Sequence, residues 1–173
     1  YSNPQAFIVN NASGIKGAWA MAFDSNDNLF VSSWEIKLTQ VNTNGVITYT
    51  AREVGLIYKI STTGSIINYA SGVGRVYSIL VDSDGTLYLS SNTKNCIFKV
   101  VHAVDREVGA VSTVVSGIYS PCCMVWSDDK NSIYLASSGS GENGKVSIIA
   151  KNGSSSSVLA SGLGPVFGIV KNS

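Results

Sequence analysis

Carboxylate side chains recur in pairs at three points of the sequence, and paired carboxylates can bind calcium or perform acid–base chemistry. Each pair falls between two apolar stretches, where an aspartate ordinarily accepts hydrogen bonds from the backbone two residues further on. The segment after Asp82 reads Ser-Asp-Gly and lacks the later carboxylate that completes a calcium loop. We therefore expect all three pairs to shape turns. The pairs are Asp24 with Asp27, Asp82 with Asp84, and Asp128 with Asp129.

The chain contains one histidine, which limits the metal and acid–base chemistry that it can supply. That residue, His102, stands at the end of a predicted strand, and a two- or three-histidine zinc site needs more imidazoles than this. A pair between His102 and a thiol is the alternative to an exposed loop position, which we expect. The three cysteines, Cys96, Cys122 and Cys123, are too few for a disulfide framework and are expected to be small apolar strand residues. The sequence thus predicts neither a metal site nor a cofactor.

Charge is low and balanced over the 173 residues, with 12 basic and 11 acidic side chains. No cluster of Lys or Arg is present that would neutralise several phosphates, so nucleic acid and a charged membrane surface are not expected partners. No apolar run reaches the roughly 18 residues that span a bilayer, so we expect no membrane insertion. A protein partner or self-association is the remaining expectation.

The elements that must position these residues are short strands. The chain has 17 glycines and 3 prolines, and 45% of its residues are apolar. Val, Ile, Thr and Tyr fill the space between the glycines, and no stretch has a persuasive period of 3.6 residues. This composition is typical of strands joined by tight turns. The sequence predicts an all-β fold.

A strand–turn–strand pattern occurs three times, in residues 18–33, 76–91 and 121–137. Two further strands follow each copy, so the full unit has four short antiparallel strands. Such a unit with a period near 45 residues describes one blade of a β-propeller. The period is given by glycines at equivalent positions, Gly14, Gly72, Gly117 and Gly162, which are 58, 45 and 45 residues apart.

The first unit is longer than the others because of an insertion at about 35–54. The insertion alternates around Asn44 and Gly45, a dipeptide suited to a two-residue turn, and predicts an added hairpin that projects from the blade. The whole chain is expected to be a single domain. Within residues 1–173 we predict blades at 18–70, 76–115 and 121–160 and partial blade strands at 6–10 and 166–171.

About three blades and two loose strands are too few for a comfortable ring, because closed propellers usually have at least four blades. The sequence is either an excerpt of a longer propeller, or one of several copies that combine into a ring, or an open arc. We favour the excerpt. Unpaired propeller edges promote association, so a larger ring or assembly is expected.

The second unit carries the motif Leu-Val-Asp-Ser-Asp-Gly-Thr-Leu-Tyr-Leu at 80–89, and an Asn-containing stretch precedes Ile97. In these residues the chain resembles the NHL-repeat family of β-propellers. The resemblance extends over almost the whole chain apart from the insertion, and it implies a propeller fold. Gluconolactonase, virginiamycin-lyase and strictosidine-synthase-like propellers share the pattern, whereas the Gly-His and Trp-Asp pairs of WD repeats are missing. NHL propellers similar to the peptide-amidating lyases need several histidine ligands, which this chain lacks.

The first strand of each propeller blade lines a central channel. Four residues occupy one equivalent position on these strands by the glycine offsets: Trp19, Tyr77, Cys122 and Phe167. The aromatic members either wedge adjacent blades together or form a recognition surface. Both alternatives place them near the axis or at a blade boundary.

The loops that enter the first strands, together with the loops between second and third strands, should form one face. Arg75 is of particular interest there, because an arginine beside Tyr77 and Tyr119 can hold a carboxylate or a backbone carbonyl of a partner. A solvated loop arginine is the alternative. The full candidate ligand or partner face consists of Trp19, Trp34, Arg75, Tyr77, Asn92, Lys94, Asn95, Tyr119 and Phe167.

The balanced charge and the lack of a convergent catalytic set favour a non-enzymatic protein-interaction or scaffolding module. The first alternative is a hydrolase or lactonase-like propeller enzyme with a central metal, and the second is a carbohydrate-binding propeller. Against the enzyme, the glutamates lie outside the predicted channel-lining strands. These glutamates are Glu35, Glu53, Glu107 and Glu142.

Two glycosylation sequons stand beside predicted turns, at Asn11 and Asn152. They are accessible acceptors only in a protein that enters the secretory pathway. We therefore expect an extracellular or secretory location, with a cytoplasmic one as the alternative.

Overall fold

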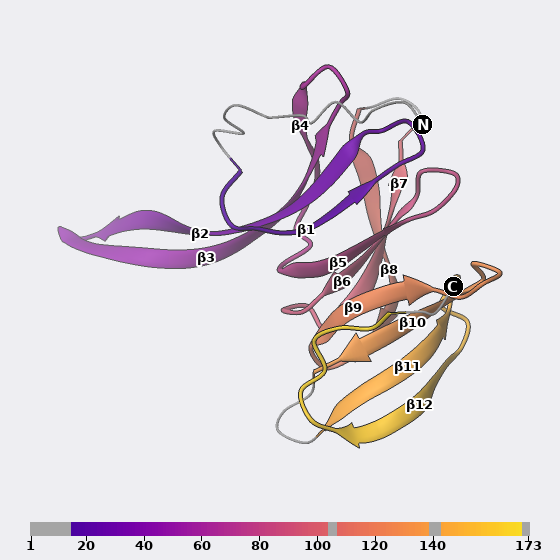
Figure 1. Cartoon of the computed structure of the whole chain (residues 1–173). Coiled ribbons are helices and arrows are strands. Elements are labelled where there is room, and N and C mark those ends of the chain that lie inside the picture. The colour runs from indigo at the N-terminus through magenta and orange to yellow at the C-terminus, as the bar shows by residue number, and fades with distance from the viewer. Residues whose placement is uncertain (1–14, 104–106, 139–142, 171–173) are drawn as a thin grey trace.

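The computed structural model describes residues 15–103, 107–138 and 143–170, and these residues form three four-stranded antiparallel sheets. The predicted all-β fold with propeller blades is confirmed, and the described residues contain no helix. The inner strands β1, β5 and β9 are neighbours, and the sheets fan out from them (Figure 1). Blade 1 consists of β1 (Ala18–Phe23), β2 (Leu29–Thr43), β3 (Val46–Ile60) and β4 (Ile66–Ser71); blade 2 of β5 (Val76–Val81), β6 (Leu87–Ser91), β7 (Cys96–His102) and β8 (Gly109–Ser116); blade 3 of β9 (Pro121–Trp126), β10 (Ser132–Ser137), β11 (Gly144–Ala150) and β12 (Ser156–Leu163).

Aspartates close the turns between the first two strands of each blade. Asp24 Oδ1 accepts hydrogen bonds from the backbone N–H groups of Asn26 and Asn28, both at 2.9 Å. Asp84 Oδ1 accepts one from Thr86 N–H at 2.9 Å. Such bonds hold the chain in a turn where no ladder partner is available. Within the described ranges no group of three or more metal-binding side chains is present.

The hydrophobic core lies between the blades. Phe30 and Tyr69 of blade 1 pack with Leu89 of blade 2, and their rings meet edge-on with centroids 5.1 Å apart. A second cluster joins Ile97 of blade 2 to Leu135 of blade 3. Full burial of an aliphatic side chain contributes about 1.5–3 kcal/mol, so each blade is stabilised by its neighbour rather than by its own sheet alone.

Buried serines connect the blades near the inner strands. Ser32 Oγ donates to the carbonyl oxygen of Val76 at 2.9 Å, and Ser90 Oγ donates to that of Cys122 at 2.7 Å. The two serines occupy equivalent places on β2 and β6, and each reaches the first strand of the next blade. These bonds satisfy backbone groups that a bulged inner strand leaves unpaired.

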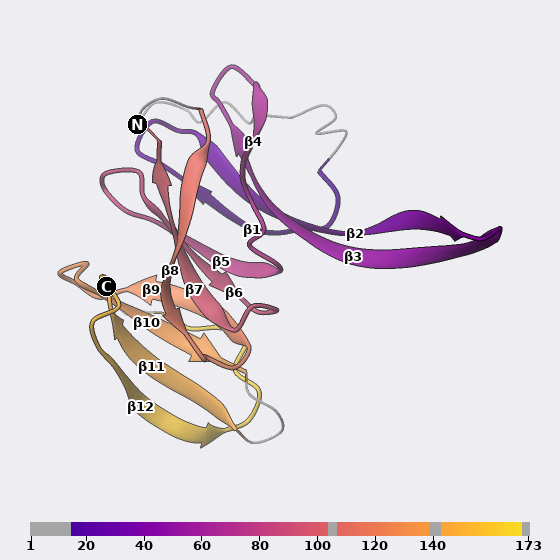
Figure 2. The same cartoon turned by 180° about the vertical axis from the view of Figure 1, so that it is seen from behind.

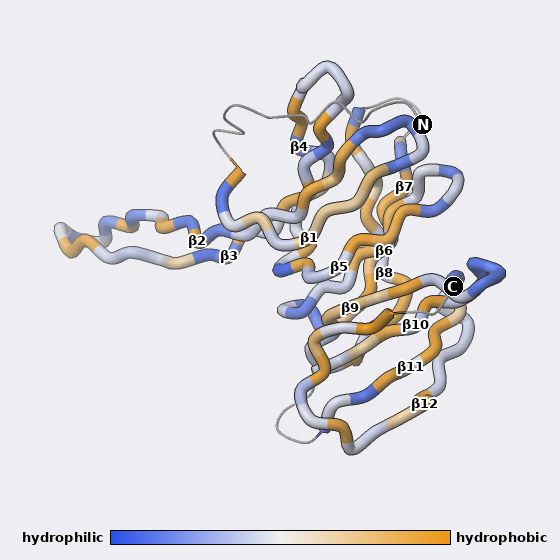
Figure 3. The backbone as a smooth tube through the Cα atoms, viewed as in Figure 1, coloured by the Kyte–Doolittle hydropathy of each residue, from blue (hydrophilic) through white to orange (hydrophobic). Residues whose placement is uncertain are grey.

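The inserted residues form a hairpin that continues β2 and β3, each 15 residues long. The ladder runs without interruption from Leu29 opposite Ile60 to Thr43 opposite Val46. Asn44 and Gly45 close it with φ of 54° and 80°, the left-handed values of a type I′ turn. The hairpin projects away from the blades in both views (Figures 1 and 2), and apolar and polar residues are interspersed along it (Figure 3).

The predicted partial strand at 166–171 is a correction to the sequence analysis. Residues 165–170 are described and form no strand. An inner strand becomes regular by pairing with the second strand of its own blade, and no such strand pairs with this segment. The predicted strand at 6–10 and the sequon residue Asn11 lie outside the described residues. In the described part of the chain, no helix is long and apolar enough to cross a membrane.

Candidate functional site

The loops at one end of the blades are tied into a single surface, which we call the loop face. In each blade a residue of the second strand or directly after it donates its N–H to the loop that precedes the first strand. In blades 2 and 3 this residue follows β6 and β10, and in blade 1 it lies within the lengthened β2. The pairs are Trp34 to Gly17 at 3.1 Å, Asn92 to Arg75 at 2.8 Å and Ser138 to Ser120 at 3.1 Å. The same backbone contact in three blades brings the entry to each first strand beside the second strand of that blade or the residue after it, and these segments form the loop face.

Arg75 is held on two sides at the blade 1 end of the loop face. Its Cζ lies 3.8 Å from the ring centroid of Trp34, and its Nη2 lies 3.0 Å from Glu53 Oε1. Its side chain is 32% exposed and that of Glu53 is 40% exposed, so both remain accessible from solvent. The expected neighbours, Tyr77 and Tyr119, are thus replaced by an indole and a carboxylate. A guanidinium in this setting is oriented by stacking and by charge at once.

Two nitrogen atoms of this cluster are buried without a hydrogen-bond partner among the described residues. They are Nε of Arg75 and Nε1 of Trp34. A buried unsatisfied donor costs about 1–3 kcal/mol and is rare in folded proteins. Local violations of this kind concentrate at functional sites, where stability is given up for chemistry or binding.

Two glycines create the space in which Arg75 sits. A Cβ on Gly55 of β3 would overlap the backbone of Gly74, and a Cβ on Gly74 would meet Thr93 Oγ1. Gly74 also has a φ of 66°, in the left-handed region. The loop can therefore lie directly against β3, and Thr93 Oγ1 then accepts the N–H of Arg75 at 3.0 Å. Close backbone approach sets the position of the guanidinium.

An aromatic pair extends the loop face toward the inner strands. Trp19 and Tyr77 stack across the boundary of blades 1 and 2, with centroids 5.1 Å apart and an angle of 26° between their planes. Both fall at register shifts of the inner strands, and Trp19 is 59% exposed. The pair thus joins two blades and also presents ring surface to solvent. Cys122, at the equivalent position of blade 3, is buried, and Phe167 is 76% exposed in the segment after β12.

Most polar residues predicted for the face hold its loops in place. Asn92 Nδ2 donates to Ser120 Oγ at 2.6 Å, and Asn95 Oδ1 accepts the N–H of Ser120 at 3.0 Å. Lys94 lies with its Cγ beside Gly74. Tyr119 is 60% exposed and lines a cleft between blades 2 and 3. The asparagines therefore support the loops on which Arg75 and Tyr119 stand.

His102 lies at the opposite end of the blades. It ends β7 and stacks on Tyr69, with centroids 6.3 Å apart and nearly parallel planes. Burial, and to a lesser extent the charge of Asp24, raise the pKa of Tyr69. His102 and Glu107 line a second cleft of about 270 Å³, away from Arg75. Asn152, the described sequon residue, stands exposed in the turn between β11 and β12.

Glu53 is the residue that the sequence analysis missed. It was set aside because β3 does not line the channel, but the lengthened β3 brings it against the loop of the next blade. One signal was present in the sequence: the tetrapeptide Arg-Glu-Val-Gly at 52–55, whose glycine is the contact point for Gly74. A glycine inside a strand often marks such a close approach.

The comparisons with known proteins identify the fold. No family model and no curated protein sequence matches the chain. A solved streptogramin B lyase matches with a TM-score of 0.57 at 15% identity, covering 86% of this chain and 42% of its own. Two structures of virginiamycin B lyase from Staphylococcus aureus, one selenomethionine-substituted and one a catalytically inactive variant with quinupristin, match with TM-scores of 0.49 and 0.48 at 13% identity, covering 84% and 87% of this chain and 56% and 57% of theirs.

The chain is a run of β-propeller blades that spans 42% of the length of the streptogramin B lyase. This finding corrects the main functional expectation. The sequence favoured a non-enzymatic interaction or scaffolding module, whereas the propeller that these blades resemble is an enzyme.

Proposed function

We propose that the chain belongs to a propeller enzyme that binds its substrate on the loop face and acts on it with Arg75 and Glu53. The observation that carries this proposal is the Arg75 guanidinium held between the indole of Trp34 and the carboxylate of Glu53, with both charged groups still partly exposed. A cationic donor and a carboxylate in direct contact, beside exposed aromatic surface, can both bind and act on one substrate.

Arg75 is suited to a carbonyl or carboxylate oxygen. A guanidinium carries five N–H donors in a planar fork, and Glu53 engages it through Nη2. Stacking on Trp34 fixes the plane of this fork. A substrate oxygen that accepts from the fork would have its developing negative charge stabilised by a group already in place.

Glu53 is suited to the role of base. With the carbonyl of the substrate on Arg75, its carboxylate would take the proton from the adjacent carbon. The electron pair of that C–H bond forms a C=C bond, and the bond from the next carbon to the leaving group breaks with its electrons. Proton abstraction next to a polarised carbonyl followed by such an elimination is a lyase reaction.

The stacked Trp19 and Tyr77 supply a surface for an apolar part of the substrate. Ligand sites are largely apolar, with a few polar groups that fix orientation. The exposed ring surface of Trp19 offers the apolar area, and the Arg75–Glu53 pair offers the polar groups that fix orientation. The likeness of the blades to a streptogramin B lyase supports this assignment and suggests a streptogramin B compound as the substrate. The motif at 80–89 supports the further inference that the blades are of the NHL type.

Turnover of a streptogramin B antibiotic, followed by mass spectrometry, tests the proposal. We expect loss of the parent compound with wild-type protein and products whose summed mass equals that of the parent, because an elimination adds no water. Arg75→Met should lower kcat/KM at least about 30-fold, the equivalent of about 2 kcal/mol for a lost charge-assisted hydrogen bond. Lys37→Met, which removes a cation of the exposed hairpin, should leave turnover unchanged. Lack of turnover by wild-type protein, or full activity of Arg75→Met, would contradict it.

A further inference from the structure

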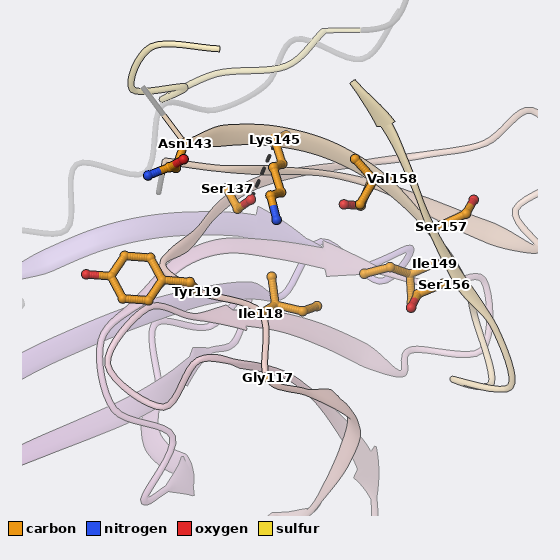
Figure 4. A pocket seen from close by; sticks show the side chains of 11 residues that line it. Gly117, Ile118, Tyr119, Ser137, Asn143, Lys145, Ile149, Ser156, Ser157 and Val158 are labelled. Atoms are coloured by element: carbon orange, nitrogen blue, oxygen red, sulfur yellow. Dashed lines mark hydrogen bonds between the residues drawn. The ribbon is translucent and has the colours of Figure 1, made fainter. Parts of the chain in front are cut away.

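A cleft of about 350 Å³ lies between the loop that joins blades 2 and 3 and the strands of blade 3. Its volume falls within the range of small-molecule sites. One wall is the loop before β9, with Ile118 and Tyr119, and the other is formed by β11 and β12 (Figure 4). It shares Tyr119 with the candidate face but lies away from the Arg75 cluster. Its lining consists of Gly117, Ile118, Tyr119, Ser137, Asn143, Lys145, Ser147, Ile149, Ser156, Ser157 and Val158.

The cleft exists because blade 3 lacks an aromatic ring that the other blades carry. The third strands of the three blades carry Tyr58, Phe98 and Ser147 at equivalent positions. They pair with Val31, Leu89 and Leu135, respectively, on the second strands. Phe98 packs against the core between blades 1 and 2. Ser147 occupies the same place in blade 3 and leaves the volume of that ring unfilled.

Lys145 places a cation beside this space. It stands opposite Ser137, as Leu56 stands opposite Ser33 and Cys96 opposite Ser91. Leu56 and Cys96 are 8% and 3% exposed, so the position is apolar and buried in the other two blades. In Figure 4 the amine of Lys145 points into the cleft between its two walls. Among the described residues, no carboxylate lies within ion-pair distance of this amine.

The remaining lining suits a ligand with one apolar and one polar end. Ile118 and Val158 offer aliphatic surface, and the hydroxyl groups of Ser156 and Ser157 lie on the β12 side. An aromatic ring in the unfilled volume would repeat the packing that Phe98 makes in blade 2. An anionic group on such a ring would meet the charge of Lys145 and gain a charge-assisted hydrogen bond.

We propose that this interblade cleft binds a small aromatic carboxylate, with the ring in the space opened by Ser147 and the carboxylate on Lys145. The proposal does not depend on the chemistry of Arg75 and Glu53. Two differences between blade 3 and the other blades define the ligand: Ser147 stands where they carry an aromatic ring, and Lys145 stands where they carry Leu56 and Cys96.

Titration calorimetry with phenylacetate tests the site. Two further probes are compared with it: phenylacetamide, which lacks the charge, and acetate, which lacks the ring. We expect wild-type protein to bind phenylacetate at least about tenfold more tightly than either probe. Ser147→Phe restores the ring of the other blades and should abolish binding, whereas Ser147→Ala keeps the space open and should bind as wild type. Lys145→Met should weaken binding at least about tenfold, and Lys37→Met should not, since a charge-assisted hydrogen bond contributes about 1.5–3 kcal/mol.

Three results would overturn the proposal. The first is the absence of any heat of binding at about 10 mM phenylacetate. This concentration is about ten times the Kd of about 1 mM that such a small ligand can reach. The second is equal affinity for phenylacetate and phenylacetamide. The third is unchanged binding by Lys145→Met, which remains informative even if Ser147→Phe fails to fold.

Discussion

The ion pair between Asp82 and Lys151 links blades 2 and 3 at the end opposite the loop face, and replacing Lys151 by methionine should destabilise the protein. Asp82 follows β5, and its side chain is 3% exposed. Lys151 follows β11, reaches across the blade boundary, and lies with its amine 5.8 Å from the ring centroid of Trp126. The substitution would leave a buried carboxylate without its cation.

The magnitude follows from the burial of the two partners. Removal of one partner from a fully buried pair costs about 3–5 kcal/mol, and an exposed pair is worth about 0–1 kcal/mol. Lys151 is 35% exposed, so solvent screens part of the interaction, and Ser83 N–H still donates to Asp82 at 2.8 Å. We expect a loss of about 2 kcal/mol, which for a domain of this size lowers Tm by about 4–8 °C.

The effect should depend on pH. Burial alone would raise the pKa of Asp82, but the hydrogen bonds from Lys151 and Ser83 outweigh it and hold this pKa below its ordinary value. The contribution of Asp82 is therefore present above the unfolded pKa of about 3.9 and is lost as the pH falls through the lower folded value. The hydrogen bond to Asp82 raises the pKa of Lys151, whose contribution is lost only as the pH rises through a value above about 10.4.

Thermal unfolding followed by circular dichroism measures both effects. The Tm difference between wild type and Lys151→Met should be constant from about pH 5 to pH 9 and should shrink as the pH falls below the unfolded pKa of about 3.9, toward the lower folded pKa of Asp82. Lys37→Met, which breaks an ion pair on the exposed hairpin, should change stability by less than about 1 kcal/mol. Equal Tm values for the two variants, or a difference that persists in acid, would refute this reasoning.

Three further predictions concern the framework of the site. Ser90→Ala should lower the free energy of unfolding in urea by about 1–2 kcal/mol, because the buried carbonyl of Cys122 loses its donor, and an unchanged midpoint would contradict the interblade role. Gly55→Ala should cost about 1–3 kcal/mol, since a Cβ there overlaps the backbone of Gly74; wild-type stability would show that the loop does not lie against β3. Replacement of residues 38–51 by Asn-Gly should leave Tm within about 2 °C, because these residues are exposed, and a large loss would mean that the hairpin supports the blades.

The blades could be predicted from the sequence because their signals are local. Alternating apolar residues, turn aspartates and glycines at a regular spacing specify strands and turns within a few residues of one another. Residues 165–170 also have the pattern of an inner strand but form none, because a strand needs a partner to pair with as well as suitable residues. Strand formation is decided by the partner as well as by the residues.

The candidate site was only partly visible in the sequence. The equivalent positions of Trp19 and Tyr77 follow from the repeat, and the structure stacks the two rings. The partners of Arg75 do not follow from it, because Trp34 and Glu53 reach the guanidinium through the lengthened β2 and β3 of the preceding blade. Contacts between blades depend on how sheets pack, which the pattern within one blade does not specify.

Steady-state turnover of a streptogramin B antibiotic by Glu53→Gln tests the account most directly. Glutamine keeps the shape of the side chain and a hydrogen-bond acceptor for Arg75 but cannot take a proton. If Glu53 is the base, kcat should fall by about 100-fold or more while KM stays within about threefold, because general base catalysis contributes about 10²–10⁴-fold. A kcat equal to that of the wild type would contradict the assignment of the loop face as the catalytic site.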